Sequence, residues 1–239
     1  MILPVFRLSV RALLRQRRTI ALVAVSAAPV VMAVAYALAK PPDAHPHMFY
    51  SHLVQDLFVP TVASVVALVF GVSAFGDERE DGTILYLVAT PQPRLQLAAA
   101  KIAAAWTATL VVLAPSLVLS GVIALGGDLT IGMVGWPLLG VAAAAVAYCA
   151  AAAWLSLHTR RPVVIGMLYI LLWEGSIATF AASAAKLSIS AYGRAFVAQS
   201  LPQASPPVTG AAAAAVVLAV VVAVASWGTA RALSHTELP

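Results

Sequence analysis

Apolar residues fill six long stretches of the chain, and short polar or proline-containing segments separate them. The stretches run over about 19–39, 53–76, 97–125, 132–157, 162–184 and 210–231. Crossing the hydrocarbon core of a bilayer takes about 20 apolar residues in an α-helix. None of the stretches alternates polar and apolar residues as the strands of a membrane barrel do. The pattern therefore predicts an all-α integral membrane protein, with six transmembrane helices in a single transmembrane domain over 1–239.

The composition supports this interpretation and excludes other classes of protein. Of the 239 residues, 62% are hydrophobic and 10% are charged, against about 45–50% and about 25% in soluble domains. The single cysteine, Cys149, excludes an intrachain disulfide framework and a cysteine-based zinc site. The formal charge of +5 comes from basic residues that flank the apolar stretches. Nucleic-acid binding would instead need a basic patch on a folded face.

Lysine and arginine are distributed unequally between the two sides of the predicted membrane. Eleven lie on the side of the N-terminus, and three (Lys40, Lys186 and Arg194) lie on the other. By the positive-inside rule, both termini and the loops at 77–96 and 158–161 face the cytoplasm. The segment 185–209 then lies outside, as an interfacial helix, an external gate or a plain connector.

Arginines recur every three or four residues before the first span, and apolar residues occupy the remaining sectors. This spacing predicts an amphipathic helix over 1–18 that lies at the membrane surface with its arginines toward anionic lipid. Ordinary topology-setting charge explains the same residues and is compatible with that helix. The basic face consists of Arg7, Arg11, Arg15 and Arg18.

The most polar segment lies between the second and third stretches. After an acidic exit from the second span, Gly82 interrupts the helix and Thr83 is suited to cap a new one. Four apolar residues follow at a spacing that places them on one helical face, and Pro91 ends the helix. These four are Ile84, Leu85, Leu87 and Val88. So short a helix is marginal alone, so we expect it to pack on this protein, on lipid or on a partner.

The residue order of this loop resembles the first cytoplasmic loop of the permease subunits of type-2 ATP-binding-cassette (ABC) exporters. The shared pattern is Glu-x-x-x-Gly-Thr-(Ile/Leu)-x-x-Leu-x-x-x-Pro-x-x-Arg, followed by a lysine. It falls on Glu78, Gly82, Thr83, Ile84, Leu87, Pro91, Arg94 and Lys101. The predicted six-span layout, the basic N-terminal helix and the cytoplasmic termini are also similar to that family. Two positions depart from its pattern, Tyr86 and Pro93.

The resemblance implies that the loop is a coupling helix, which docks on a separate ATPase subunit and transmits its ATP-driven closure. No Gly-x-x-x-x-Gly-Lys-(Ser/Thr) phosphate loop occurs in the chain, so we expect no enzymatic activity and no cofactor here, with ATP and Mg²⁺ on the partner. The resemblance also implies a second permease copy or a related permease, in the inner membrane of a prokaryote. The docking residues would be Glu78, Glu80, Gly82, Thr83, Ile84, Leu85, Leu87, Val88, Pro91, Arg94 and Lys101.

Glu174 is an ionisable residue near the middle of the fifth stretch, where a charge costs at least about 2.5 kcal/mol. It lines a translocation path or gate, holds helices together through hydrogen bonds, or lies at a shallower depth if the helix breaks near Gly175. One alternative function is a proton-coupled secondary transporter that uses Glu174, and another, independent of Glu174, is a non-transporting membrane anchor or assembly factor. Three histidines in the first external loop could ligate zinc or copper or make the loop sensitive to pH, but a proline-rich loop gives them no fixed geometry, so we expect solvated side chains and no metal site. They are His45, His47 and His52.

Overall fold

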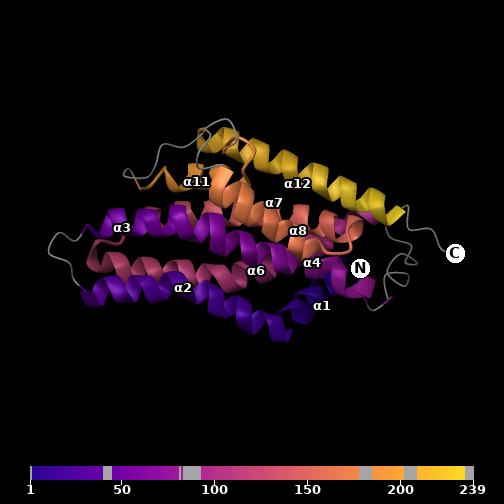
Figure 1. Ribbon diagram of the computed structural model, residues 1–239, viewed down its shortest axis with the longest axis horizontal. Coiled ribbons are helices and arrows are strands. Elements are labelled where there is room, and N and C mark those ends of the chain that lie inside the picture. The colour runs from indigo at the N-terminus through magenta and orange to yellow at the C-terminus, as the bar shows by residue number, and fades with distance from the viewer. Residues whose placement is uncertain are drawn as a thin grey trace.

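The computed structural model describes residues 2–39, 45–80, 82, 93–177, 185–201 and 209–234, and every regular element in these ranges is a helix. Figure 1 shows the long helices running side by side as one bundle. The start of α1 (Ile2–Leu14) and the end of α12 (Ala211–Ser234) lie at the same end of this bundle. Short or π-helical segments interrupt the long helices at several points.

The remaining helices follow the predicted spans along the chain. The first part consists of α2 (Arg17–Ala39), then α3 (Pro46–His52), the π-helix η1 (Leu53–Ala63) and α4 (Ser64–Glu80) without a break between the last three. The middle consists of α6 (Arg94–Leu125), the 3₁₀-helix η2 (Gly126–Asp128) and α7 (Ile131–His158). The last part consists of α8 (Pro162–Leu168), the π-helix η3 (Tyr169–Ile177) and α11 (Ile189–Val197), before α12.

Five helical segments of the described ranges are long and apolar enough to cross a membrane. They are Arg17–Ala39, Pro46–Arg79, Arg94–Asp128, Ile131–His158 and Ala211–Ser234. A shorter apolar helix, Pro162–Glu174, occupies the position of the predicted fifth span, whose residues 178–184 lie outside the described part. The all-helical membrane class is thus confirmed, whereas the count of six spans and the side of the termini stay predictions.

The second span is the most enclosed helix of the bundle. In its most apolar window 78% of the residues are buried, against 22% for Arg17–Ala39 and 17% for Ala211–Ser234. The C-terminal half of this span, α4, packs against both α6 and α7. A Cβ built at Gly71 would lie 2.8 Å from the Cβ of Ala152 and 2.8 Å from the carbonyl oxygen of Cys149. Only a residue without a side chain therefore lets α4 approach α7 this closely.

The helix that contains the predicted second span begins at Pro46, before the predicted start of the span near residue 53. Proline suits the first turn of a helix, and Tyr50 and Ser51 of that turn region are buried in the bundle. A polar residue that faces the interior of the protein can lie within a membrane helix, whereas one that faces lipid carries a large cost. As a result His47 and His52 lie on helix α3 rather than in a loop, and the Nδ1 of His52 lies 2.9 Å from an oxygen of Asp56.

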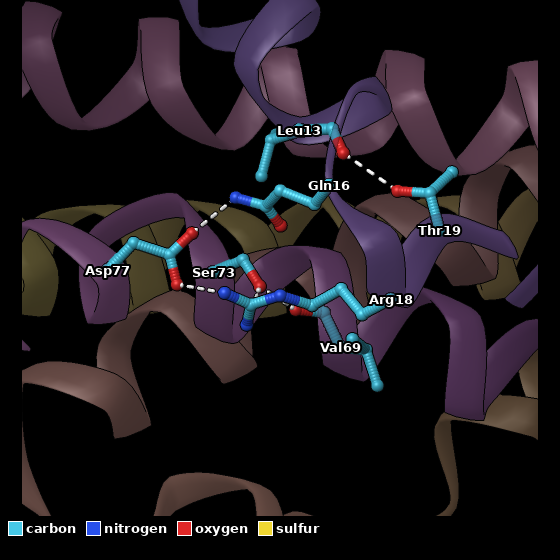
Figure 2. A network of polar contacts seen from close by, with 7 residues as sticks. All are labelled: Leu13, Gln16, Arg18, Thr19, Val69, Ser73 and Asp77. Carbon is cyan, nitrogen blue, oxygen red and sulfur yellow. Dashed lines mark hydrogen bonds and ion pairs between the residues drawn. The ribbon is translucent and has the colours of Figure 1, made fainter. Parts of the chain in front are cut away.

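The N-terminal helix ends earlier than the predicted 1–18. Helix α1 stops at Leu14, and α2 begins at Arg17 in a new direction. The hydroxyl of Thr19 donates to the carbonyl oxygen of Leu13 at 2.8 Å and so satisfies one of the carbonyls at the end of α1 (Figure 2). Arg18 therefore belongs to the first turn of the first span and not to the surface helix.

Candidate functional site

Of the five consecutive charged residues at 77–81, the first three lie at the end of the second span, just before the loop that the sequence marks as most polar. They are Asp77, Glu78 and Arg79, which we call the α4 exit cluster. Asp77 accepts hydrogen bonds from the Nε2 of Gln16 and from a guanidinium nitrogen of Arg18, each at 2.6 Å. Figure 2 shows both side chains reaching Asp77 from the junction of α1 and α2. Asp77 thus joins α4 to the N-terminal pair of helices.

The neighbouring carboxylate, Glu78, turns to a different helix. It forms an ion pair with the ammonium group of Lys101, which comes from α6 and is only 4% exposed. The same ammonium group donates to the carbonyl oxygen of Ala74 at 2.8 Å and lies 5.3 Å from the ring centre of Phe75. The cation is therefore surrounded by groups of α4, as a buried charge requires. Glu78 and Lys101 join α4 to α6.

Arg79 connects α4 to a third helix. Its Nη1 donates to the carbonyl oxygen of Ser156 at 2.8 Å and to that of Thr159 at 3.0 Å. These carbonyls belong to the C-terminal end of α7, where the last carbonyls lack partners within the helix and a cation is electrostatically favourable. Arg79 thus caps α7 from the end of α4.

Helical geometry explains why three successive residues reach three neighbours. Side chains one position apart on an α-helix project about 100° from each other. The three side chains of the α4 exit cluster therefore span about 200°, just over half of the circumference of α4, which belongs to the most enclosed helix of the bundle. Asp77 faces α2 and the junction that precedes it, Glu78 faces α6, and Arg79 faces α7. One helical turn connects the end of the second span to all of these helices.

A second polar cluster surrounds Glu174 in η3. Its side chain is 2% exposed, and the hydroxyl of Tyr148 on α7 donates to it. The backbone N–H groups of Ile189 and Ser190 donate to the same carboxylate at 3.0 and 3.3 Å, and the hydroxyl of Ser188 lies at 3.3 Å. These groups belong to the first turn of α11 and its N-cap. Glu174 therefore accepts hydrogen bonds from N-terminal amides that have no partner within the helix.

Helix α11 is held from its other side by a contact between two glycines. A Cβ built at Gly140 of α7 would lie 2.5 Å from the carbonyl oxygen of Gly193. One built at Gly193 would lie 3.0 Å from the Cβ of Ala144 and 3.1 Å from Val59. Backbone thus lies directly on backbone at this crossing. Glu174 and the Gly140–Gly193 contact together fix the position of α11 against the bundle.

Comparison with protein families now decides the class of the chain. The sequence profile of the family described as "ABC-2 family transporter protein" matches residues 14–189, which is well over half of the 239 residues. The chain belongs to the ABC-2 transporter family. It is a membrane-embedded permease subunit of an ABC transporter, and membership implies a partner ATPase subunit. No curated protein matches the chain by sequence.

The predicted docking residues of this ABC-2 permease fall partly on the described structure. Glu78 and Lys101 pair with each other inside the chain, so Lys101 holds α6 to α4 and is not presented at the surface. Arg94 begins α6, and Gly82 is exposed with a φ of +67°, a left-handed conformation that favours glycine. Six predicted residues lie outside the described part, as does the side chain of Glu80. They are Thr83, Ile84, Leu85, Leu87, Val88 and Pro91.

The predicted basic face of the N-terminal helix is divided by the break after α1. Arg7 and Arg11 lie on α1 and Arg15 follows it, and all three are exposed. Arg18 instead donates to the hydroxyl of Ser73 at 3.0 Å and to Asp77 (Figure 2). Its role in the permease is therefore a contact between helices, which the spacing of the arginines did not indicate.

The sequence indicated the charged residues of the two clusters but not the residues that bond to them. The acidic exit and Glu174 were both singled out, but Gln16, Ser73 and Tyr148 gave no signal. Polar residues of this kind are common in membrane helices, and their partners lie on helices distant in sequence. The run Ser188-Ile189-Ser190 carries the one usable signal, because serine before a helix is a frequent N-cap.

Proposed function

We propose that residues 81–92, with the adjoining turns of α4 and α6, form the coupling loop through which the ATPase subunit drives this permease. The observation that carries the proposal is the α4 exit cluster, which bonds to the junction of α1 and α2, to α2, to α6 and to the end of α7 immediately before the loop. For docking of the ATPase to drive transport, the loop that it contacts must be joined to helices that move together. The α4 exit cluster supplies such a junction.

A force applied to the loop would act first on the end of α4. Because Glu78 is paired with Lys101, α6 would follow α4 and the two helices that flank the loop would move as a unit. Asp77 would carry the displacement to the junction of α1 and α2, and Arg79 would carry it to the end of α7. ATP-driven closure would thereby change the packing of most of the bundle at once.

We propose that this end of the bundle faces the cytoplasm. Eleven of the fourteen lysines and arginines lie on this side of the predicted spans, as the positive-inside rule requires. The start of α1 and the end of α12 lie together there (Figure 1). The membrane would be the inner membrane of a prokaryote.

The complete transporter would contain two permeases and act as an exporter. One chain offers one coupling loop, whereas the resemblance implies two ATPase subunits that close on each other. A second copy or a related permease would supply the other loop. The proposed direction of transport, export, rests on the resemblance of the loop residues at 78–101 to those of type-2 exporters.

The burial and the hydrogen bonds of Glu174 favour a positioning role over proton coupling. A proton carrier needs a carboxyl group that is open to a path, whereas Glu174 is 2% exposed and meets donors from Tyr148, Ile189 and Ser190. We propose that it influences the translocation path indirectly, by holding α11 in place. This helix would then act as the gate at the end of the bundle opposite the coupling loop.

The experiment that tests the proposal is reconstitution of the full chain in vesicles together with its ATPase subunit. The permease is expected to change the rate of ATP hydrolysis by the ATPase, because docking couples their conformations. Asp77→Ala should reduce this change while both proteins remain in the vesicles. An ATPase rate that does not respond to the permease would instead indicate a membrane anchor.

A further inference from the structure

A groove lies between α7 and α12, and no residue of the α4 exit cluster lines it. Its mouth, at the end of the bundle where both helices end, has a volume of ≈ 550 Å³ and is lined by Trp154, His158, Trp227 and Arg231 among others. An adjoining part of ≈ 460 Å³ continues along the two helices between residues such as Ala151, Val220 and Val224. Trp154, Trp227 and Gly228 line both parts. The two parts therefore form one groove with a polar mouth and an apolar trough.

The mouth combines positive charge with aromatic rings. The guanidinium carbon of Arg231 lies 5.3 Å from the ring centre of Trp227, and the ring of His158 lies 4.6 Å from that of Trp154. Among the described residues, no carboxylate lies within ion-pair distance of Arg231. Tryptophan is enriched where membrane helices meet the headgroup layer. These features are typical of a cationic site at the depth of lipid phosphates.

The trough is formed by one side of α12. Val220, Val224, Trp227 and Arg231 follow each other at spacings of three and four residues, so they share a helical face. The first three are more than half exposed, at 56%, 63% and 58%. This face is therefore apolar for most of its length and becomes cationic at its end.

Gly228 keeps the groove open. A Cβ at this position would lie 2.8 Å from two atoms of the Trp154 indole ring. The indole consequently lies against the bare backbone of α12 instead of across the groove. The size of the mouth thus depends on a glycine of α12 and a tryptophan of α7.

We propose that this groove binds one anionic phospholipid, with its phosphate at Arg231 and an acyl chain along the trough. Charge complementarity argues for an anionic headgroup, because basic pockets between membrane helices bind such headgroups. The apolar trough argues for a lipid over a free anion, which would leave that part of the groove unfilled. The site is separate from the proposed docking of an ATPase and does not depend on it.

Quenching of tryptophan fluorescence by brominated lipids tests the site, because Trp154 and Trp227 line it. The full chain is reconstituted in phosphatidylcholine vesicles that contain increasing fractions of brominated phosphatidylglycerol or brominated phosphatidylcholine. Subtracting the signal of Trp154→Phe/Trp227→Phe removes the contribution of the other tryptophans. Half-maximal quenching is expected at an about fivefold lower fraction of the anionic lipid, the factor for one basic side chain at a membrane surface.

Three variants distinguish a site from a general preference for anionic lipid. Arg231→Gln should remove the difference between the two lipids, and Arg231→Lys should retain it because the charge is kept. Arg161→Gln, which removes an exposed charge at the same end of the bundle, should leave it unchanged. Excess inorganic phosphate should not displace the brominated lipid.

Other results would overturn the proposal. Equal quenching by both lipids would mean that the groove is an ordinary lipid-facing surface. Absence of quenching by either would mean that protein, such as a second copy of the chain, covers it. A preference that persists in Arg231→Gln would place the anionic site elsewhere, and displacement by phosphate would assign the mouth to a soluble anion.

Discussion

The guanidinium group of Arg18 donates to the carboxylate of Asp77 at 2.6 Å, and this contact joins the first turn of α2 to the last turn of α4. The two residues are 59 positions apart in the sequence. Gln16 occupies the other oxygen of the same carboxylate (Figure 2). The acidic exit of the second span is therefore committed to neighbouring helices of the permease before any ATPase docks.

Removing the charge of Asp77 should affect coupling more than stability. The two side chains of the pair are 47% and 24% exposed, and ion pairs open to solvent contribute at most about 1 kcal/mol. Asp77→Asn should therefore lower Tm by only about 2–4 °C, while the response of the ATPase to the permease falls severalfold. Thermal unfolding and ATP hydrolysis measure the two effects.

The partner of Asp77 provides the control for that experiment. If Arg18 and Asp77 act through each other, Arg18→Gln/Asp77→Asn should be little worse than either single variant, because the interaction is lost only once. Fully additive losses would mean that the two residues act separately.

Replacing Lys101 by Met should destabilise the permease far more. The ammonium group is buried against Ala74 and Glu78, and removing one partner of a buried ion pair costs about 3 kcal/mol. We expect Tm to fall by roughly 6–12 °C, with partial recovery in Glu78→Gln/Lys101→Met. Lys186→Met removes an exposed lysine and should change Tm little. A small effect of Lys101→Met would contradict the role of the pair in joining α4 to α6.

The positions of the long helices follow from the sequence, whereas the contacts between them do not. Apolar length alone places α6 at Arg94–Leu125 against a predicted 97–125, because lipid leaves no other arrangement for such a stretch. The helix of the second span begins earlier than the apolar stretch, at Pro46, because Tyr50 and Ser51 are buried in the bundle although they follow a polar segment. Lys101 was assigned to docking by the resemblance of the loop, and its pairing with Glu78 of α4 could not be read from the sequence.

Glu174 is predicted to control the first turn of α11. Glu174→Leu removes the acceptor of the Ile189 and Ser190 amides, and each hydrogen bond to a charged group contributes about 1.5–3 kcal/mol. Hydrogen exchange of these amides should therefore accelerate by at least about tenfold. Tyr148→Phe, which removes one donor, should give a smaller acceleration.

Hydrogen exchange also separates this role from proton coupling. Glu174→Gln keeps an acceptor oxygen for α11 and should protect the amides better than Glu174→Leu. Loss of function in Glu174→Gln with unchanged exchange would instead assign Glu174 to the translocation path itself.

The crossing of α7 and α11 should not tolerate a methyl group. Gly140→Ala would place its Cβ 2.5 Å from the Gly193 carbonyl, so α11 must move away, and we expect a loss of about 1–3 kcal/mol as for overpacking in a core. Gly135→Ala is the matched control on the same helix, because nothing lies within 4 Å of its Cβ. It should leave stability unchanged or raise it by up to about 1 kcal/mol. Equal tolerance of both substitutions would contradict the close contact.

Docking of the ATPase on the loop between α4 and α6 is the central claim, and copurification measures it most directly. The ATPase subunit should copurify with the wild-type permease and be lost from Leu85→Asp/Leu87→Asp, because two carboxylates cannot enter an apolar interface without a large cost. Ile131→Asp/Leu187→Asp places the same charges on two exposed apolar residues outside the loop and should retain the ATPase. Normal copurification of Leu85→Asp/Leu87→Asp, with both proteins folded, would contradict the account.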